Sequence, residues 1–575
     1  MGGIQNNFLT SVSFHAIVDT VKEPQTMKEG IGMKKCICLI LALCLLCGCA
    51  LCEGLDRTGK YRLNENGEAV IDDVTFSGLD VPDDNNRVFY EIFVGSFSDS
   101  NGDGVGDLRG IINRLDYLND GDPASGLSLG VEGIWLTPIF ASPSYHKYDV
   151  ADFYAVDPAF GTMEDLKDLI DGCHARGIKL ILDLPINHTS TQNRWFKNFL
   201  NAHLMQNPGN AYYDFYSWLP QGETAPAGRH FVQANNAKVR YEANFSDSMP
   251  EPDFDNEDVR KAMLDVALYY IGLGVDGFRF DAAKYIYFGD NERSADFWAW
   301  YMGELKAVKS DLYAVAEVWD GDGVIDQYLP IMNCFNFTMS QMSGLIAETG
   351  KGGSAGRFTD YVQTYQQHLD ALGGGSVNVM FVSNHDMDRA AGYLTAASGQ
   401  MKMAANLYLL SPGSPFIYYG EEIGLRGSRG SANTDANRRL AMLWGDGDTV
   451  ADPEGATYPK NKQTPSTVKE LMQNGDSLYS YYKRLLMIRK ANPEIARGAY
   501  TALNLQDNKV GGFCCEWNGR RVYVLHNSSL AAKTVDLRSF AGDAALQLAA
   551  AIGMNGASLD GTLLTLEPQT SAVLR

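Results

Sequence analysis

The sequence predicts an α/β protein built on a (β/α)8 barrel, with a small domain inserted after the third strand and an antiparallel β-sandwich at the C-terminus. Two observations predict the barrel. Short apolar runs alternate with amphipathic helical patterns over most of the chain, which is typical of parallel βα units. Acidic or histidine side chains directly follow several of these runs, at the strand ends where such barrels carry their functional groups.

Length and charge limit the number of domains and the kinds of binding partner that the chain can have. The chain has 575 residues, enough for one large domain and one or two small ones. Its formal net charge is -22 at pH 7, which argues against a nucleic-acid partner because a polyanion would be repelled. A neutral ligand meets no such repulsion. We expect the protein to act as a monomer.

The N-terminal part of the chain carries an export signal. Met33 is followed by two lysines and by an apolar run at 36–47, which is too short to cross a bilayer. The run ends in the letters LCGCA, which resemble a bacterial lipobox, so we expect cleavage before Cys49 and a lipid on its thiol. Residues 1–48 would then be a leader and residues 49–86 a polar tether, which anchors the protein outside the cytoplasm on the bacterial membrane. An ordinary signal peptide would instead release it.

Eight segments supply the barrel strands. Seven short apolar runs read as strands, and the stretch at 334–337 supplies the remaining one, so that the expected strands are residues 88–93, 133–136, 178–183, 275–280, 313–316, 334–337, 377–382 and 415–419. A helical pattern begins near Met163, ahead of the third strand. The barrel is therefore expected to span residues 87–188 and 251–490.

Two regions depart from this alternation. Residues 189–250 are polar, with many Asn, Gln and aromatic residues and no clear helix. They are too long for a βα loop, so we expect an inserted domain B. Beyond residue 491 the helical period stops, and runs such as 521–525 and 563–566 alternate like antiparallel strands. This predicts a C-terminal β-sandwich over residues 491–575.

Four predicted strands end in charged motifs, which read DLPINH at 183–188, GFRFDAAK at 277–284, EVW at 317–319 and FVSNHD at 381–386. A charged side chain directly after an apolar strand is costly to hold unless water or a ligand satisfies it. A single one could be a structural carboxylate paired with an arginine. Four at corresponding strand ends indicate one shared site.

Together these motifs resemble those of the α-amylase family, glycoside hydrolase family 13. Segments that read GIWLTP at 133–138, MP at 249–250 and GSPFIYYGEE at 413–422 follow in the family's order. The resemblance implies a retaining glycosidase that cleaves α-linked glucans with three carboxylates. These are Asp281 as nucleophile, Glu317 as general acid/base and Asp386 as the group that stabilises an oxocarbenium-like transition state.

Spacing gives two of these roles a physical basis. Arg279 lies two residues before Asp281, so both side chains point to the same side of the strand, and the guanidinium favours the ionised carboxylate. Glu317 must be protonated to assist the leaving oxygen, and a nearby Asp281 charge would raise its pKa.

The resemblance also implies contacts to the sugar. The residues expected to bind substrate are Tyr148 as a stacking platform, with Asp149, His188, Arg279, His385 and Arg439. We expect Arg439 to pair with Asp149, and the neighbouring Arg438 is the alternative partner.

The first βα loop predicts a calcium site. Residues 99–107 read DSNGDGVGD, which places oxygen ligands at alternate positions and glycines where the chain must wrap tightly. The same loop resembles the calcium loop of several amylase-family enzymes. The expected ligands of Ca²⁺ are the side chains of Asp99, Asn101, Asp103 and Asp107 and the carbonyl of Val105.

The resemblance leaves the exact reaction open. Hydrolysis of α-1,4-glucosidic bonds in starch or maltooligosaccharides is the favoured interpretation, supported by Met249-Pro250 and by the segment that starts at Pro143. Glu251, inserted before Asp253, departs from the usual amylase form. An exo-acting α-glucosidase, an oligo-1,6-glucosidase and a transglycosylase are alternatives within the family. A non-catalytic glucan-binding protein is a more distant one, since all three carboxylates are retained.

Overall fold

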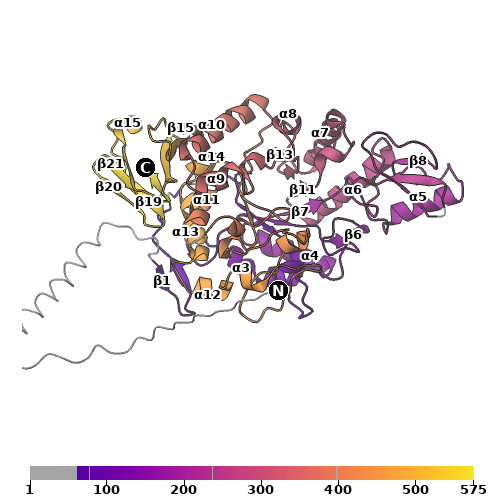
Figure 1. Ribbon diagram of the computed structural model, residues 1–575, viewed down its shortest axis with the longest axis horizontal. Helices are drawn as coiled ribbons and strands as arrows, with labels where there is room; N and C mark the ends of the chain where they lie inside the picture. Colours follow the sequence, from indigo (N-terminus) through magenta and orange to yellow (C-terminus); the bar gives the residue numbers. More distant parts are fainter. Residues whose placement is uncertain (1–60, 77, 80, 236, 396–398) are drawn as a thin grey trace, which may run out of the picture. The chain divides into compact units, whose positions relative to one another are not determined.

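The computed structural model describes residues 61–575, apart from residues 77, 80, 236 and 396–398 (Figure 1). The expected leader, the lipidation site Cys49 and the first part of the tether lie outside this range. Across the described residues, no helix is both long enough and apolar enough to cross a membrane.

A parallel sheet of seven strands, in the order β13-β12-β11-β7-β4-β3-β14, forms the centre of the fold. Its strands are β3 (Phe89–Ile92), β4 (Gly133–Leu136), β7 (Lys179–Leu184), β11 (Gly277–Phe280), β12 (Tyr313–Ala316), β13 (Asn333–Cys334) and β14 (Phe416–Tyr418). Each overlaps a strand expected from the sequence. The predicted (β/α)8 barrel is therefore confirmed.

The remaining barrel segment, which is the seventh along the chain, is not a regular strand, although the sequence predicts one at 377–382. The Asn336 N–H donates to the Val379 carbonyl on one side, and the Phe416 N–H donates to the Met380 carbonyl on the other. A parallel bridge joins Phe335 to Val379. The segment thus closes the barrel with few bonds, because its neighbour β13 has only two residues before the chain turns away.

Alternation along the strands fills the barrel interior. Ten buried apolar or aromatic side chains form one interior cluster, made of Phe89, Trp135, Ile181, Tyr313, Val315, Phe335, Val379, Phe381, Met387 and Phe416. Two residues further along β3, β7 and β12, the chain carries Glu91, Asp183 and Glu317. Since every second residue of a strand faces the same side, the acids lie above an apolar plug.

Helices cover the outside of the barrel. They are α2 (Leu108–Asn113), α3 (Leu115–Leu118), α4 (Met163–His174), α6 (Glu257–Leu273), α7 (Asn291–Val308), α8 (Asp322–Ile325), α9 (Leu345–Gly350), α10 (Ala355–Leu372), α11 (Gln400–Leu409), α12 (Val468–Met472), α13 (Leu478–Ala491) and α14 (Glu494–Arg497). The helix expected near Met163 begins there, because Thr162 and Asp165 form a capping box. Helix α6 ends at Gly274, whose φ of 105° suits glycine.

The inserted domain contains a three-stranded antiparallel sheet, in the order β8-β10-β9. Its strands are β8 (Trp218–Pro220), β9 (Phe231–Gln233) and β10 (Val239–Glu242). The expectation of no clear helix in this segment is wrong, since α5 spans Arg194–Leu204. Asn193 caps this helix, and it buries Phe196, Phe199 and Ala202 at a three-residue spacing. Polar residues on the other face hide the pattern.

Two antiparallel sheets form the C-terminal part, drawn in yellow in Figure 1. The larger has the order β15-β16-β17-β22-β19 and the smaller β18-β21-β20. Their strands are β15 (Ala499–Ala502), β16 (Val510–Trp517), β17 (Arg520–Asn527), β18 (Lys533–Asp536), β19 (Leu548–Gly553), β20 (Ala557–Asp560), β21 (Leu563–Leu566) and β22 (Thr570–Leu574). Buried residues of both sheets share one cluster, which confirms the predicted sandwich.

The lead-in to the barrel is partly structured. A hairpin of β1 (Tyr61–Leu63) and β2 (Ala69–Ile71) lies in the segment expected to be a tether. All of β2 is buried. The Lys483 ammonium on α13 donates to the Ala69 carbonyl at 2.5 Å, and Arg484 pairs with Asp73 at 2.6 Å. This part of the lead-in therefore packs against the barrel domain.

Candidate active site

The ends of two adjacent strands bring Asp281 and Glu317 to the same height. Strands β11 and β12 pair in parallel with Phe280 opposite Ala316, so the next residue on each strand is one of these two acids. The Glu317 N–H donates to the Phe280 carbonyl at 3.0 Å. Both acids therefore leave neighbouring strands at the same rim of the barrel.

One guanidinium holds three carboxylates together. The Arg279 side chain is 1% exposed, and its Nη1 lies 2.7 Å from Oδ1 of both Asp183 and Asp281. Its Nη2 lies 2.5 Å from Glu317 Oε2. Burial lowers the pKa of Arg279, but the surrounding acids raise it well above its usual value. Arg279 is therefore a permanently charged clamp.

The same surroundings set the protonation of the two acids. Burial raises the pKa of Glu317 to about 7, opposed by Arg279 and assisted by Asp281 and Asp386. Burial also raises the pKa of Asp281, while Arg279 and a side-chain hydrogen bond with Glu317 lower it. Arg279 thus favours the ionised Asp281, as expected, but burial outweighs its effect. With a pKa of about 7, Glu317 is still partly protonated at neutral pH and can donate that proton.

The backbone directly after Asp281 is strained. Ala282 has φ 45° and ψ 42°, in the left-handed region that residues with a Cβ seldom adopt. Its N–H lies 3.3 Å from Glu317 Oε2. Such strain is retained where the surrounding structure over-determines it, and it is common at functional sites.

Asp386 is held by two cations. Its Oδ1 lies 2.7 Å from Arg439 Nη2, and its Oδ2 lies 2.9 Å from His385 Nε2. Burial raises the pKa of Asp386, but His385 and Arg439 hold it well below its usual range. Asp386 is therefore a fixed negative charge.

His385 lies between two carboxylates. Its Nδ1 is 2.6 Å from Glu91 Oε1, on the side opposite its contact with Asp386. Burial lowers the pKa of His385, but Asp386 and Glu91 raise it to about 10. His385 is accordingly an imidazolium over the physiological range.

Tyr148 forms one wall of the site. Its hydroxyl donates to Asp183 Oδ2 at 2.8 Å and lies 2.6 Å from His385 Nε2. The rings of Tyr148 and His385 stack with centroids 5.5 Å apart. His188 Nε2 lies 3.1 Å from the Tyr148 carbonyl, and burial lowers the pKa of His188 to about 4. His188 is therefore a neutral hydrogen-bonding group.

The expected pairing of Arg439 with Asp149 is wrong. Besides Asp386, Arg439 donates to the Tyr145 hydroxyl and to the His385 carbonyl, both at 3.1 Å. Its donors are thus directed to the end of the seventh barrel segment, where a carboxylate needs a cation.

Asp149 is satisfied by neutral donors instead. Its Oδ1 accepts from the hydroxyls of Ser142, at 2.7 Å, and Ser144. Arg438, the alternative partner, forms ion pairs at 2.8 Å with Asp388 and Asp435. Asp149 is buried, and its hydrogen bonds to the two serines hold the segment that carries Tyr148 in place.

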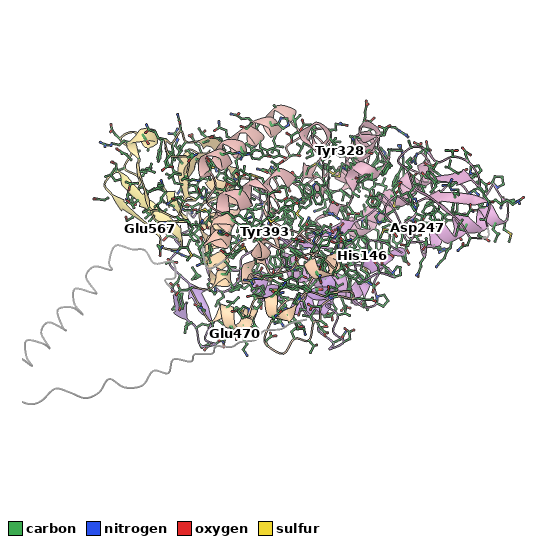
Figure 2. The ribbon with its side chains drawn as sticks, in the orientation of Figure 1. His146, Asp247, Tyr328, Tyr393, Glu470 and Glu567 are labelled. Atoms are coloured by element: carbon green, nitrogen blue, oxygen red, sulfur yellow. The ribbon has the colours of Figure 1, made fainter. Side chains whose placement is uncertain are left out.

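Two cavities meet at the carboxylates. The first cavity, of about 640 Å³, is lined by residues that include Tyr145, His146, Tyr148, His188, Phe245, Asp281, Lys284 and Arg439. The second cavity, of about 700 Å³, is lined by residues that include Gln341, Met342, Asp388, Tyr393, Arg429, Arg438 and Tyr458. His146 lines the first cavity and Tyr393 lines the second, and both residues are labelled in Figure 2. The residues that line both are Glu317, Trp319, Asp386 and Asp435.

In the expected calcium loop, the aspartate side chains accept hydrogen bonds from the backbone of the loop and of helix α2. Asp99 accepts hydrogen bonds from the N–H groups of Asn101, Gly102 and Gly104 and from the Thr449 hydroxyl. Asp103 accepts from Val105 N–H, and Asp107 caps α2 through Gly110 N–H. Among the described residues, no three His, Cys, Asp or Glu side chains are gathered as a metal site. The oxygen-only donors of the loop nevertheless have the chemistry that a hard cation needs.

No role was predicted for three residues of the site, although two of them, Asp183 and Trp319, stand in the motifs at 183–188 and 317–319. Glu91 and Asp183 are charged residues inside otherwise apolar strands, and that contrast was the available signal. Trp319 is 44% exposed, lines both cavities and stacks on Phe337 with centroids 4.8 Å apart. A tryptophan two residues after the strand-end acid Glu317 was the available signal for this residue.

Comparison with known proteins agrees with this geometry. A model of the α-amylase catalytic domain matches residues 91–498, a range that holds all three carboxylates. Alpha-amylase 3 of Dictyoglomus thermophilum is 33% identical over 455 residues, which cover 78% of this chain and 86% of the relative. A 4-alpha-glucanotransferase of Thermotoga neapolitana is 29% identical over 456 residues, which cover 76% of this chain and 95% of the relative.

A solved structure shows the same likeness. Eubacterium rectale Amy13B superposes with a TM-score of 0.79 at 33% sequence identity, covering 86% of this chain and 96% of that one. The similarity therefore extends over the barrel and beyond the site itself.

Proposed function

This chain belongs to the α-amylase catalytic domain family, glycoside hydrolase family 13, and from that membership we propose that it hydrolyses α-1,4-glucosidic bonds in starch and maltooligosaccharides with retention of configuration. The observation that carries the proposal is the Arg279 guanidinium, which holds Asp281 and Glu317 side by side at the rim of a cavity. Retention needs two carboxyl groups on opposite sides of the scissile bond, ~5–5.5 Å apart.

The two acids have distinct tasks in this reaction. Glu317, with its raised pKa, donates its proton to the leaving glycosidic oxygen as the bond to the anomeric carbon breaks. Asp281 attacks that carbon and forms a glycosyl ester. Glu317, now ionised, takes a proton from water, and the water oxygen displaces Asp281 and releases the sugar.

Asp386 stabilises the positive charge that develops on the sugar ring. Its carboxylate is fixed by Arg439 and His385, so no reorganisation is needed when the charge appears. Tyr148 offers its ring to one face of the sugar, and His188, which lines the same cavity, offers a neutral imidazole to a hydroxyl.

The two cavities support cleavage within the glucan, rather than at its end. Glu317 and Asp386 line both, so a glucan can extend away from the bond to be cut in two directions. An exo-acting enzyme instead encloses one end of its substrate. Trp319, exposed at the junction, suits stacking against a sugar ring.

Transglycosylation is a second candidate, favoured by the likeness to the 4-alpha-glucanotransferase of Thermotoga neapolitana. It uses the same glycosyl ester of Asp281, with a sugar hydroxyl in place of water. The second cavity is large enough to receive an acceptor sugar.

The test is to incubate residues 61–575 with starch, pullulan, maltose and isomaltose and to chromatograph the early products. Endo hydrolysis gives a spread of oligosaccharides from starch. Glucose alone, or action on isomaltose only, contradicts the proposal. Products longer than a maltooligosaccharide substrate identify transfer.

We also propose that the loop at 99–107 binds Ca²⁺. Asp99, Asn101 and Asp103 would supply side-chain oxygens, with Asp107 and the Val105 carbonyl. The carboxylates of the loop now accept hydrogen bonds from its backbone N–H groups. A bound cation would replace these N–H groups as the partner of the carboxylates. The ion would stiffen the loop, which also contacts residues 448 and 449, and it takes no part in the chemistry.

Lipidation of Cys49 is proposed as the means of anchoring. It would place a monomeric enzyme at the outer face of a bacterial membrane, where polymeric glucan outside the cell can reach it. Expression of the full chain with labelled fatty acid should label the protein. Label that persists after Cys49→Ala would reject the assignment.

A further inference from the structure

We propose that Glu91 is a positioning residue of the reaction, which keeps His385 doubly protonated and so fixes Asp386 for its work. The proposal rests on the function proposed above, because it concerns the same site. Glu91 comes from β3, on a strand that contributes no other polar group to the carboxylate cluster.

The first argument is the contact between Glu91 and His385. Glu91 Oε1 lies 2.6 Å from His385 Nδ1 and also accepts a hydrogen bond from the backbone N–H of His385 at 3.2 Å. The Glu91 side chain is buried, with 1% of the residue exposed. Among the described residues, His385 is the only one that forms an ion pair with Glu91. A buried carboxylate is strongly disfavoured without a cation beside it, and His385 is the cation that meets Glu91.

The second argument is the count of protons on the ring. His385 Nε2 lies 2.9 Å from Asp386 Oδ2, so each ring nitrogen faces a carboxylate oxygen. A neutral imidazole carries one N–H and can donate to only one of them. With both carboxylates ionised, the ring must carry both protons.

The remaining neighbours do not remove this requirement. The Tyr148 hydroxyl lies 2.6 Å from Nε2 but is itself a donor to Asp183, and the Trp135 ring packs edge-on at 5.6 Å. The other charged groups around His385 are Asp183, Arg279, Glu317 and Arg439. With Glu91 and Asp386 included, four carboxyl groups surround His385 against two guanidinium groups, and both guanidinium groups are engaged by carboxylates of the site.

The consequence for the reaction follows from Asp386. Its two oxygens are oriented by His385 and Arg439, and loss of the Glu91 charge would remove the support for one of these cations. Asp386 could then rotate or gain a proton, and the developing charge on the sugar would be less stabilised.

The variant is Glu91→Gln, whose amide oxygen can still accept from the His385 ring and backbone but carries no charge. The matched control is Glu422→Gln. Glu422 is another buried glutamate; it accepts a hydrogen bond from Tyr90, the residue before Glu91, and lies outside the site.

The ratio of wild-type to variant kcat/KM on a maltooligosaccharide is measured from pH 6 to pH 9. For Glu91→Gln we expect the ratio to rise at least tenfold across this range, mainly through kcat. For Glu422→Gln it should stay constant. A constant ratio for Glu91→Gln would overturn the proposal, because a merely structural role has no such pH dependence.

A second readout does not depend on activity. Nitrogen-15 NMR of the His385 imidazole reports whether one or both nitrogens are protonated. At pH 8 we expect two protonated nitrogens in the wild type and one in Glu91→Gln. A neutral wild-type ring would reject the positioning role even if the enzyme is active. A doubly protonated wild-type ring that loses a proton in Glu91→Gln, in a protein without glucan activity, would reject the proposed function while supporting the effect of Glu91 on His385.

Discussion

Arg279 and Asp281 lie on the same face of strand β11, and Nη1 of the arginine is 2.7 Å from Oδ1 of the aspartate. Spacing along one strand fixes this pair, since residues two apart point the same way. The other end of the guanidinium reaches Glu317 on the next strand. A single cation therefore sets the distance between the two groups that must act on one bond.

Replacement of Arg279 by lysine should abolish most activity. An ammonium cannot span Asp183, Asp281 and Glu317 as the planar guanidinium does. We expect kcat/KM to fall at least about 100-fold, with a stability loss of about 3–5 kcal/mol from unpaired buried acids. Initial rates and urea unfolding measure the two effects.

The control for that change is Arg114→Lys. Arg114 also pairs with two carboxylates, Asp446 and Asp448, but it lies outside both cavities. Its activity should stay within a factor of about two of the wild type. Equal losses in both variants would mean that Arg279 acts through general stability.

The pH dependence should report Glu317. Since the general acid works when protonated and its pKa is about 7, kcat/KM should fall as pH rises through 7, by about tenfold per pH unit. A stopped assay of reducing ends over pH 5–9 measures this limb. A rate that stays level to pH 9 would show that Glu317 is not the proton donor.

A buried acid outside the site should make stability pH-dependent. Glu421 accepts hydrogen bonds from the hydroxyls of Tyr408 and Tyr482, and burial raises its pKa from 4.5 to about 7. The folded state then binds more protons than the unfolded chain between these values. Its contribution is present below pH 4.5 and is lost as pH rises through 7, on the order of 3 kcal/mol.

The variant Glu421→Gln removes this titration. Its amide oxygen can still accept from both tyrosines, so the comparison concerns the slope and not the absolute stability. We expect the Tm difference between pH 5 and pH 8 to be smaller in the variant than in the wild type. Parallel curves would place the titrating group elsewhere.

Removal of Ca²⁺ tests the loop at 99–107. Chelation should lower the Tm, because the loop contacts residues 448 and 449 and starts helix α2. In Asp103→Asn the calcium-dependent shift should shrink while the Tm in chelator stays unchanged, since the amide oxygen can still accept from Val105. A wild-type Tm that ignores chelation would reject the site.

The sequence was sufficient for most of the barrel. Apolar strands and the residues after them are local features, so β11 with Asp281 and β12 with Glu317 could be located directly. The segment at 377–382 could not be judged as easily, because a regular strand depends on partners on both sides and β13 is too short to supply one.

Contacts between distant segments were beyond the sequence. Arg439 lies next to Asp386 instead of Asp149 because loops after two different strands converge, and no spacing encodes that choice. Helix α5 was obscured by polar residues on its outer face. Glu91 was visible as an acid in an apolar strand, but its partner His385 is nearly 300 residues away.

The most direct test of the account is to trap the glycosyl ester. Glu317→Gln is mixed with an α-maltosyl fluoride, whose leaving group needs no acid, and the digested protein is examined by mass spectrometry. Because the base that activates water is missing, a sugar should accumulate on the peptide that contains Asp281. Rapid turnover without an adduct, or an adduct on the peptide of Asp386, would contradict it.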